Sequence, residues 1–250
     1  LQHQDGHSHV LASTIPNCVA YDPTYAYELA VIMQNGLERM YVKQDNVFYY
    51  ITVMNENYHQ PAMPDGVEED IIKGMYLLKE TDKPQKQHVQ LLGCGTILRE
   101  VIKAAEILEQ EHSVTSDIWS VTSFNELRRD GLVIERYNRM HPDESARQSF
   151  VSQQLSARQG PVIAATDYMR IYADQIRPYI KAPYVTLGTD GFGRSDTRER
   201  LRHFFEVDAK FIVLAVLHQL AEQGEIETST VTEAMKRYKI DPEKPEPVKH

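Results

Sequence analysis

The chain has 250 residues and a mass of 28.8 kDa, which suits one large domain or two small ones. Its composition, 42% hydrophobic and 25% charged, is that of a globular protein and excludes a disordered, collagen-like or disulfide-stapled chain. The net charge of −9, spread along the chain, argues against binding to nucleic acid or to an anionic membrane, because both favour clustered Lys and Arg.

The first 23 residues are polar, rich in histidine and predicted to be irregular, because prolines 16 and 23 each hold the preceding residue out of the helical region. Apolar residues then recur at helical spacing over residues 24–38, which predicts an amphipathic helix. Residues 46–54 are aromatic and β-branched and predict a buried strand. A proline-bearing connection follows, and we expect a domain boundary near Pro64.

Predicted helices and strands alternate beyond this boundary, which indicates a largely parallel sheet covered by helices. We expect Thr96 to cap one of the helices. The last prolines, between residues 242 and 247, predict a frayed tail. The predicted helices cover residues 67–79, 97–111 and 124–137 and begin near 167, 196, 208 and 229, and the predicted strands cover 88–92, 117–122, 161–165 and 184–187.

Three features of the sequence bear on the cellular compartment of the protein. The longest apolar run, residues 211–217, is far shorter than the roughly 20 residues that span a bilayer, so no membrane segment is expected. Cys18 and Cys94 are too few for a disulfide framework, which favours the cytoplasm. The chain opens without Met and has no Lys or Arg before Arg39, so we expect no signal peptide and a chain cut from a longer one.

The densest group of titratable residues is His3, Asp5, His7 and His9. Histidine titrates near neutral pH, so this loop could exchange protons with a reacting oxygen. A solvated polar loop or a stretch left by an expression vector explains the same pattern. A metal site is a third alternative, although the spacing fits no metal motif.

Residues 188–195 form a glycine-rich segment between a predicted strand and a predicted helix, where backbone amides could hold an anion. The glycine spacing fits neither the dinucleotide nor the Walker pattern, and a structural turn is favoured. Asp196 and Glu199 would form a capping box. The arginines of residues 194–202 are interpreted as a helix face that is paired with Glu199 and Glu206.

Two further segments allow a functional or a structural interpretation. Residues 55–59, Asn-Glu-Asn-Tyr-His, follow a predicted buried strand, where active-site groups are often placed, but a hydrogen-bonded turn fits equally well. The aromatic residues between Tyr41 and Tyr50 are expected in the core, because Lys43 is the only Lys or Arg among them, fewer than a nucleic-acid surface would interleave.

Three stretches carry a resemblance to a known family: LQHQDGHSH at residues 1–9, YYITVMNENYHQPAMP at 49–64 and LGTDGFGRSD at 187–196. They resemble the homodimeric bacterial thiamine-diphosphate-dependent pyruvate dehydrogenases. The similarity extends over essentially all 250 residues and corresponds to the last quarter to third of such a subunit.

The resemblance implies an α/β fold with two parts. Residues 1–63 would be the end of a middle, pyrimidine-binding domain, and residues 64–250 a transketolase C-terminal-like domain with three α/β/α layers. Thiamine diphosphate and Mg²⁺ would be the cofactors. The Gly-Asp-Gly motif that holds the metal and diphosphate is absent from this sequence, so we assign it no cofactor-binding or metal-binding residue and expect the chain alone to be inactive.

For the site, the resemblance implies that His3 is catalytic and hydrogen-bonds the oxygen that develops charge on the substrate carbonyl. Asp5 and His9 would bind substrate, and His7 is the weaker candidate. The implied reaction decarboxylates pyruvate and transfers the acetyl group to lipoyl groups. The implied partners are a second subunit and the dihydrolipoyl acyltransferase core with its lipoyl domains. The alternatives are a transketolase or another 2-oxo acid enzyme of this fold, and a non-catalytic dimerisation module.

Overall fold

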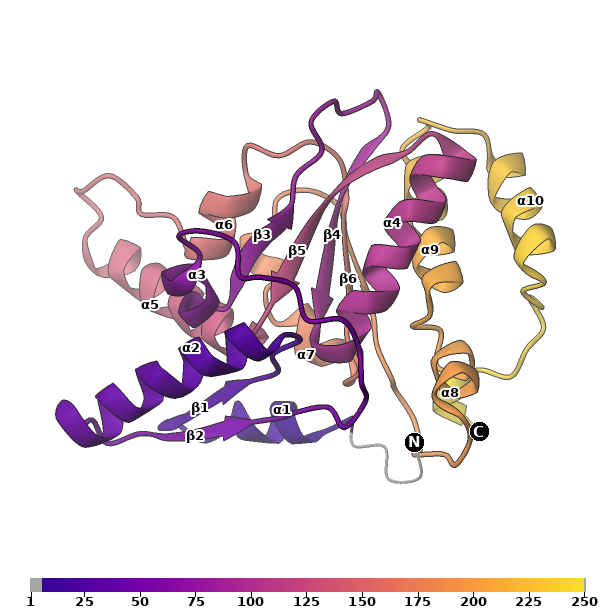
Figure 1. Cartoon of the computed structure of the whole chain (residues 1–250). Helices are drawn as coiled ribbons and strands as arrows, with labels where there is room; N and C mark the ends of the chain where they lie inside the picture. Colours follow the sequence, from indigo (N-terminus) through magenta and orange to yellow (C-terminus); the bar gives the residue numbers. More distant parts are fainter. Residues whose placement is uncertain (1–5, 250) are drawn as a thin grey trace.

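Two sheets organise the protein in the computed structural model, which describes residues 6–249 (Figure 1). A small parallel sheet pairs β1 with β2, and a five-stranded sheet has the order β3-β5-β4-β6-β7. Only β3 is antiparallel to its neighbour in the larger sheet, so the prediction of a largely parallel sheet is confirmed. The strands are β1 Cys18–Tyr21, β2 Phe48–Ile51, β3 Met75–Lys79, β4 His88–Cys94, β5 Thr115–Val121, β6 Val162–Ala165 and β7 Tyr184–Leu187.

Helices cover both faces of the larger sheet: α4 and α9 on one face, with α10 outside α9, and α5, α6 and α7 on the other (Figure 1). The helices α1, α2 and α3 pack in the cores that contain the strand β1 of the smaller sheet. The helices are α1 Ser8–Ala12, α2 Ala26–Leu37, α3 Glu68–Lys73, α4 Leu98–His112, α5 Phe124–Met140, α6 Phe150–Leu155, α7 Arg170–Asp174, α8 Arg198–Phe204, α9 Ala209–Glu222 and α10 Thr228–Tyr238.

Neighbouring residues of the central strands serve two different cores. Leu91 and Ile163 pack in the core that contains α4 and α9. Their neighbours Leu92 and Ala164 pack with Trp119 in the core that contains α5, α6 and α7. Successive side chains of a strand point to opposite faces, and a sheet covered on both faces is apolar throughout. The larger unit is therefore a three-layer α/β/α fold, as expected.

The smaller sheet joins the larger one at the carboxyl ends of their strands. The N–H of Asp22, directly after β1, donates to the carbonyl of Thr122, directly after β5, over 2.8 Å. The hydroxyl of Ser123 donates to the carbonyl of Ala20 over 2.6 Å. Ile32 of α2 is fully buried in the core beneath these contacts. The residues that follow β1, β2 and β4 are thereby brought to one place.

Two predicted elements were wrong. The helix expected over residues 67–79 is α3 followed by β3, because Gly74 takes a φ of +115° and ends the helix. A Cβ at Gly74 would lie 2.6 Å from the carbonyl oxygen of Ser123, so only glycine fits this junction. The first 23 residues are not irregular throughout, since they contain α1 and β1.

The predicted caps and the predicted aromatic core also differ from the structure. The Thr96 hydroxyl accepts from Arg202 instead of capping α4. The cap of α8 is Thr197, whose hydroxyl accepts from the N–H of Arg200, so no capping box begins at residue 196. Tyr41 and Phe48 are exposed, which contradicts their expected place in the core, and β2 is only partly buried rather than a buried strand.

The carboxyl-terminal segment is anchored, so the prediction of a frayed tail was wrong. The Lys244 ammonium donates to the carbonyl of Phe204 over 2.9 Å and to Glu206 over 2.7 Å. Pro247 is buried. A Cβ at Gly191, where φ is +110°, would lie 2.3 Å from the Pro247 carbonyl oxygen. The glycine-rich segment thus provides the surface against which the tail packs.

Candidate functional site

Polar groups from four elements meet at the carboxyl edge where the two sheets join. Asp22 directly follows β1, Thr52 directly follows β2 and Cys94 is the last residue of β4. His9 comes from α1. Strand carboxyl ends are the usual place for binding groups in open α/β folds, because side chains from several strands converge there. This cluster is our candidate functional site.

The Asp22 carboxyl group is the centre of the cluster. The Thr52 hydroxyl donates to its Oδ1 over 2.6 Å, and the Cys94 thiol lies 3.5 Å from its Oδ2. Gly95 makes room for this carboxyl group, since a Cβ there would lie 2.1 Å from Oδ2. Burial raises the pKa of Asp22 to about 7, and the nearby carboxylates of Asp167 and Glu28 act in the same direction.

His9 has no exposed side-chain surface. Its Nε2 lies 2.8 Å from the Thr52 hydroxyl oxygen. Its ring is stacked on Tyr172 at 4.9 Å between centroids and meets Tyr168 and Tyr50 edge-on at 4.6 and 5.3 Å. Packing on three sides fixes the ring orientation. The predicted role of His9 toward substrate stays a prediction.

The raised pKa of Asp22 makes stability depend on pH. A carboxyl group with a folded-state pKa near 7 and an unfolded-state value near 3.8 binds more protons in the folded state between these values, so stability falls as pH rises. Through Asp22, the free energy of unfolding of the wild type should fall by about 3 kcal/mol between pH 5 and pH 8. Asp22→Asn should not show this fall. Urea denaturation at several pH values measures the effect. Parallel curves for both proteins would contradict it.

Next to the cluster, the segment after β2 is held against α4 and α8 by arginines. Glu56 pairs with Arg99 at 2.9 Å and with Arg202 at 3.2 Å, and Arg202 also pairs with Glu100 at 3.2 Å. Burial raises the pKa of Glu56, but these arginines outweigh it and the pKa is lowered. The expected pairing of Arg202 with Glu199 and Glu206 was therefore wrong. Glu56 therefore holds the segment after β2 against α4 and α8, a role that local spacing did not predict.

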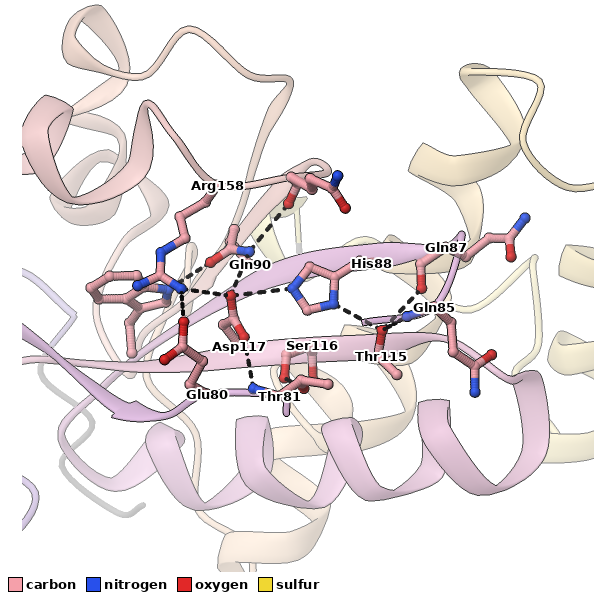
Figure 2. Close-up of polar contacts among 12 residues, drawn as sticks. Glu80, Thr81, Gln85, Gln87, His88, Gln90, Thr115, Ser116, Asp117 and Arg158 are labelled. Carbon is pink, nitrogen blue, oxygen red and sulfur yellow. Dashed lines mark hydrogen bonds and ion pairs between the residues drawn. The ribbon is translucent and has the colours of Figure 1, made fainter. Parts of the chain in front are cut away.

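A second buried polar cluster lies at the opposite, amino-terminal edge of the larger sheet (Figure 2). His88 Nδ1 lies 2.8 Å from the Thr115 hydroxyl, and His88 Nε2 lies 3.2 Å from Asp117. Burial raises the pKa of Asp117, but the N–H of Thr81 and the side chains of Gln90 and His88 outweigh it, so the pKa is lowered.

The order hydroxyl, imidazole, carboxylate in this cluster matches that of a nucleophilic triad. The Thr115 oxygen, however, is buried and also accepts from the N–H of Gln85 over 2.9 Å. Asp117 accepts hydrogen bonds from Thr81 and Gln90. It also pairs with Arg158, as the dashed lines in Figure 2 show. We interpret this cluster as structural, because its hydroxyl is engaged within the protein and does not face a substrate.

The positions of the predicted site residues are only partly described. His3 and Asp5 lie outside residues 6–249. The described chain begins at Gly6, whose carbonyl accepts from the N–H of Met169 over 2.9 Å, so the chain enters at the edge of the candidate site. The sequence analysis missed Asp22 and Thr52. The signal for Asp22 was the apolar run Cys18–Tyr21, which is β1, directly before an Asp-Pro step.

Metal and cofactor binding were tested against the described residues. Among residues 6–249, no group of three or more His, Cys, Asp or Glu side chains is placed to hold a metal ion. The cavity beside Asp167 at the carboxyl edge has a volume of about 10 Å³, which is the room for one water. This cavity is therefore too small for thiamine diphosphate. Within the same part of the chain, no helix has the length and apolarity to cross a membrane.

Comparison with known families assigns the class. The family described as the transketolase-like TK C-terminal domain matches residues 74–208, and the family described as the pyruvate dehydrogenase E1 component middle domain matches residues 1–61. The first match covers more than half of the chain, so the chain belongs to the transketolase-like C-terminal domain family.

Individual proteins with similar sequences give a more specific comparison than the family match. The chain is 61% identical over 249 residues to the pyruvate dehydrogenase E1 component of Pseudomonas aeruginosa and 56% identical to that of Escherichia coli K12. Both alignments cover 99% of this chain but 28% of the relative, so the chain spans less than a third of the proteins it matches. The resemblance inferred from the sequence motifs is confirmed.

Solved structures support the fold alone. A transketolase mutant from Pichia stipitis matches with a TM-score of 0.60 at 14% identity, and the match covers 88% of this chain and 27% of the transketolase chain. A split-gene transketolase, described as an inactive beta4 tetramer, matches with a TM-score of 0.53 at 16% identity. This match covers 88% of this chain and 62% of the transketolase chain. The transketolase-like α/β fold is thereby confirmed.

Proposed function

We propose that this chain is part of a pyruvate dehydrogenase E1 subunit, which decarboxylates pyruvate on thiamine diphosphate and transfers the acetyl group to lipoyl groups of the acyltransferase. The observation that carries the proposal is the identity of 61% across 99% of the chain. The transketolase alternative has support at the level of fold, with 14% identity. Fold does not determine chemistry, whereas high identity throughout preserves both core and site.

In this proposal the chain forms a histidine-bearing wall of the active site. His3 donates a hydrogen bond to the oxygen of the substrate carbonyl, where negative charge develops during the reaction. Asp5 and His9 orient the substrate. Residues 1–63 belong to the pyrimidine-binding domain and residues 64–250 to the C-terminal domain.

The cofactors and partners are assigned to the whole protein. We place most of the contacts to thiamine diphosphate and Mg²⁺ on other parts of the subunit, since the described residues form no group of metal ligands and the cavity beside Asp167 is too small for the cofactor. We also propose a homodimer that binds the dihydrolipoyl acyltransferase core and resides in the cytoplasm. Both cysteines are free and buried, which is compatible with a reducing compartment. The chain alone is expected to be inactive.

Assays of the full-length protein with thiamine diphosphate and Mg²⁺ test the proposal. We expect pyruvate-dependent release of carbon dioxide coupled to the reduction of an artificial electron acceptor. The control is ketol transfer from a ketose phosphate, which should stay at background. Ketol transfer without pyruvate turnover would favour the transketolase alternative, and the absence of both would favour the non-catalytic module.

A further inference from the structure

The Thr52 hydroxyl bridges two titratable groups that the sequence places far apart. It lies 2.6 Å from Asp22 Oδ1 and 2.8 Å from His9 Nε2. The Tyr21 carbonyl, at 3.4 Å from this hydroxyl, is a more distant acceptor. A hydroxyl carries one proton, so with these two nearer partners it donates to one and accepts from the other. The protonation of Asp22 and the proton position on His9 are therefore coupled.

Two proton arrangements satisfy this geometry. When Asp22 is ionised, Thr52 donates to the carboxylate and accepts from His9 Nε2–H, which leaves Nδ1 as an acceptor. When Asp22 is protonated, its O–H donates to Thr52, the hydroxyl donates to Nε2, and the His9 proton resides on Nδ1. Asp22 takes its proton from solvent, and the imidazole carries one proton in each of these two arrangements.

We propose that Asp22 sets the tautomer of His9 through the Thr52 hydroxyl, which makes Asp22 and Thr52 positioning residues for His9. The tautomer coupling stands on the geometry of these three residues. Its effect on turnover rests on the proposed function, in which His9 orients the substrate.

The packing around His9 favours a tautomer change over a reorientation of the ring. Tyr172 lies stacked on the imidazole, and Tyr168 and Tyr50 meet it edge-on. The His9 carbonyl also accepts from the Asn125 amide over 3.0 Å, which fixes the backbone. A ring held in this way responds to its partner by moving a proton rather than by turning.

The surroundings of Asp22 allow it to titrate near neutral pH. Burial is the largest cause of its raised pKa, and the groups that face it are uncharged or acidic. Cys94 comes from β4, Glu28 from α2 and Asp167 from the segment after β6. Tyr168 adjoins the same site from the segment before α7. With a pKa of about 7, both arrangements are populated between pH 6 and pH 8.

The direct test is nitrogen-15 solid-state NMR of the full-length protein labelled at histidine. The His9 signal is assigned by its loss in His9→Gln, and its chemical shifts report which ring nitrogen carries the proton. We expect the tautomer to change between pH 6 and pH 8.5 in the wild type and in Thr52→Ser, which keeps the hydroxyl. Thr52→Val should abolish the change, while Thr81→Val, which removes a hydroxyl at the opposite edge, should retain it.

A tautomer that is constant in the wild type, or that still changes in Thr52→Val, would overturn the coupling. The second readout is the pH profile of kcat/KM with pyruvate. We expect the inflection near pH 7 to disappear in Thr52→Val, with a loss of about tenfold in kcat/KM, and to persist in Thr52→Ser. An unchanged profile in Thr52→Val would overturn the positioning role. A wild type without pyruvate turnover would instead refute the proposed function, and the NMR result would decide the coupling.

Discussion

Glu28→Ala will destabilise the protein by about 4 kcal/mol or more, because one buried carboxylate binds four donors. Its Oε2 accepts from the N–H groups of Thr24 and Tyr25 over 2.5 and 2.9 Å, at the start of α2. Its Oε1 accepts from the hydroxyls of Tyr76 in β3 and Ser120 in β5, both over 2.6 Å. Glu28 therefore ties the helix of the smaller unit to two strands of the larger sheet.

The expected loss has two physical parts. Alanine leaves a cavity where a fully buried side chain stood. It also leaves up to four buried donors unpaired, and each costs more than the net value of a made hydrogen bond. Glu28→Gln is the matched control, since its oxygen can still accept from the backbone and both hydroxyls can rotate to accept from its amide.

Urea denaturation measures both variants. We expect the Gln variant to lose less than half of what the Ala variant loses. If Glu28→Ala stays within about 1 kcal/mol of the wild type, the carboxylate does not join the two units as described.

His3→Ala will lower the turnover of pyruvate by the full-length protein by about two to three orders of magnitude with the fold intact. A hydrogen-bond donor aimed at developing negative charge acts mainly in the transition state, so kcat should fall more than KM rises. His218→Ala is the matched control, because this histidine is exposed on α9, where it pairs with the exposed Glu222. An unchanged rate in His3→Ala would remove His3 from the site.

Most strands of the larger sheet could be predicted from the sequence, and β1 could not. β4 to β7 contain apolar, β-branched or aromatic residues in a segment that alternates with predicted helices, whereas β1 lies between prolines 16 and 23, which favoured an irregular segment. The end of α3 is set by Gly74, which must approach the Ser123 carbonyl from a distant part of the chain. Such a contact leaves no local pattern beyond the glycine itself.

The candidate site was predictable only in part, for the same reason. The histidine-rich loop stood out because its titratable residues are adjacent in sequence. Thr52 lies 43 residues from His9 and 30 from Asp22, so no local spacing brings these three residues together. Thr96 and Arg202 show the same limit, since a typical capping residue is used for a contact across 106 residues.

The central claim is that this chain supplies the histidine-bearing wall of a pyruvate-decarboxylating site. A crystal structure of the full-length dimer with thiamine diphosphate and a pyruvate analogue tests it most directly. The account predicts residues 1–9 against the analogue, with a nitrogen of His3 within hydrogen-bond distance of the oxygen that replaces the substrate carbonyl. Residues 1–9 directed away from the analogue, with His3 making no contact to it, would contradict the account.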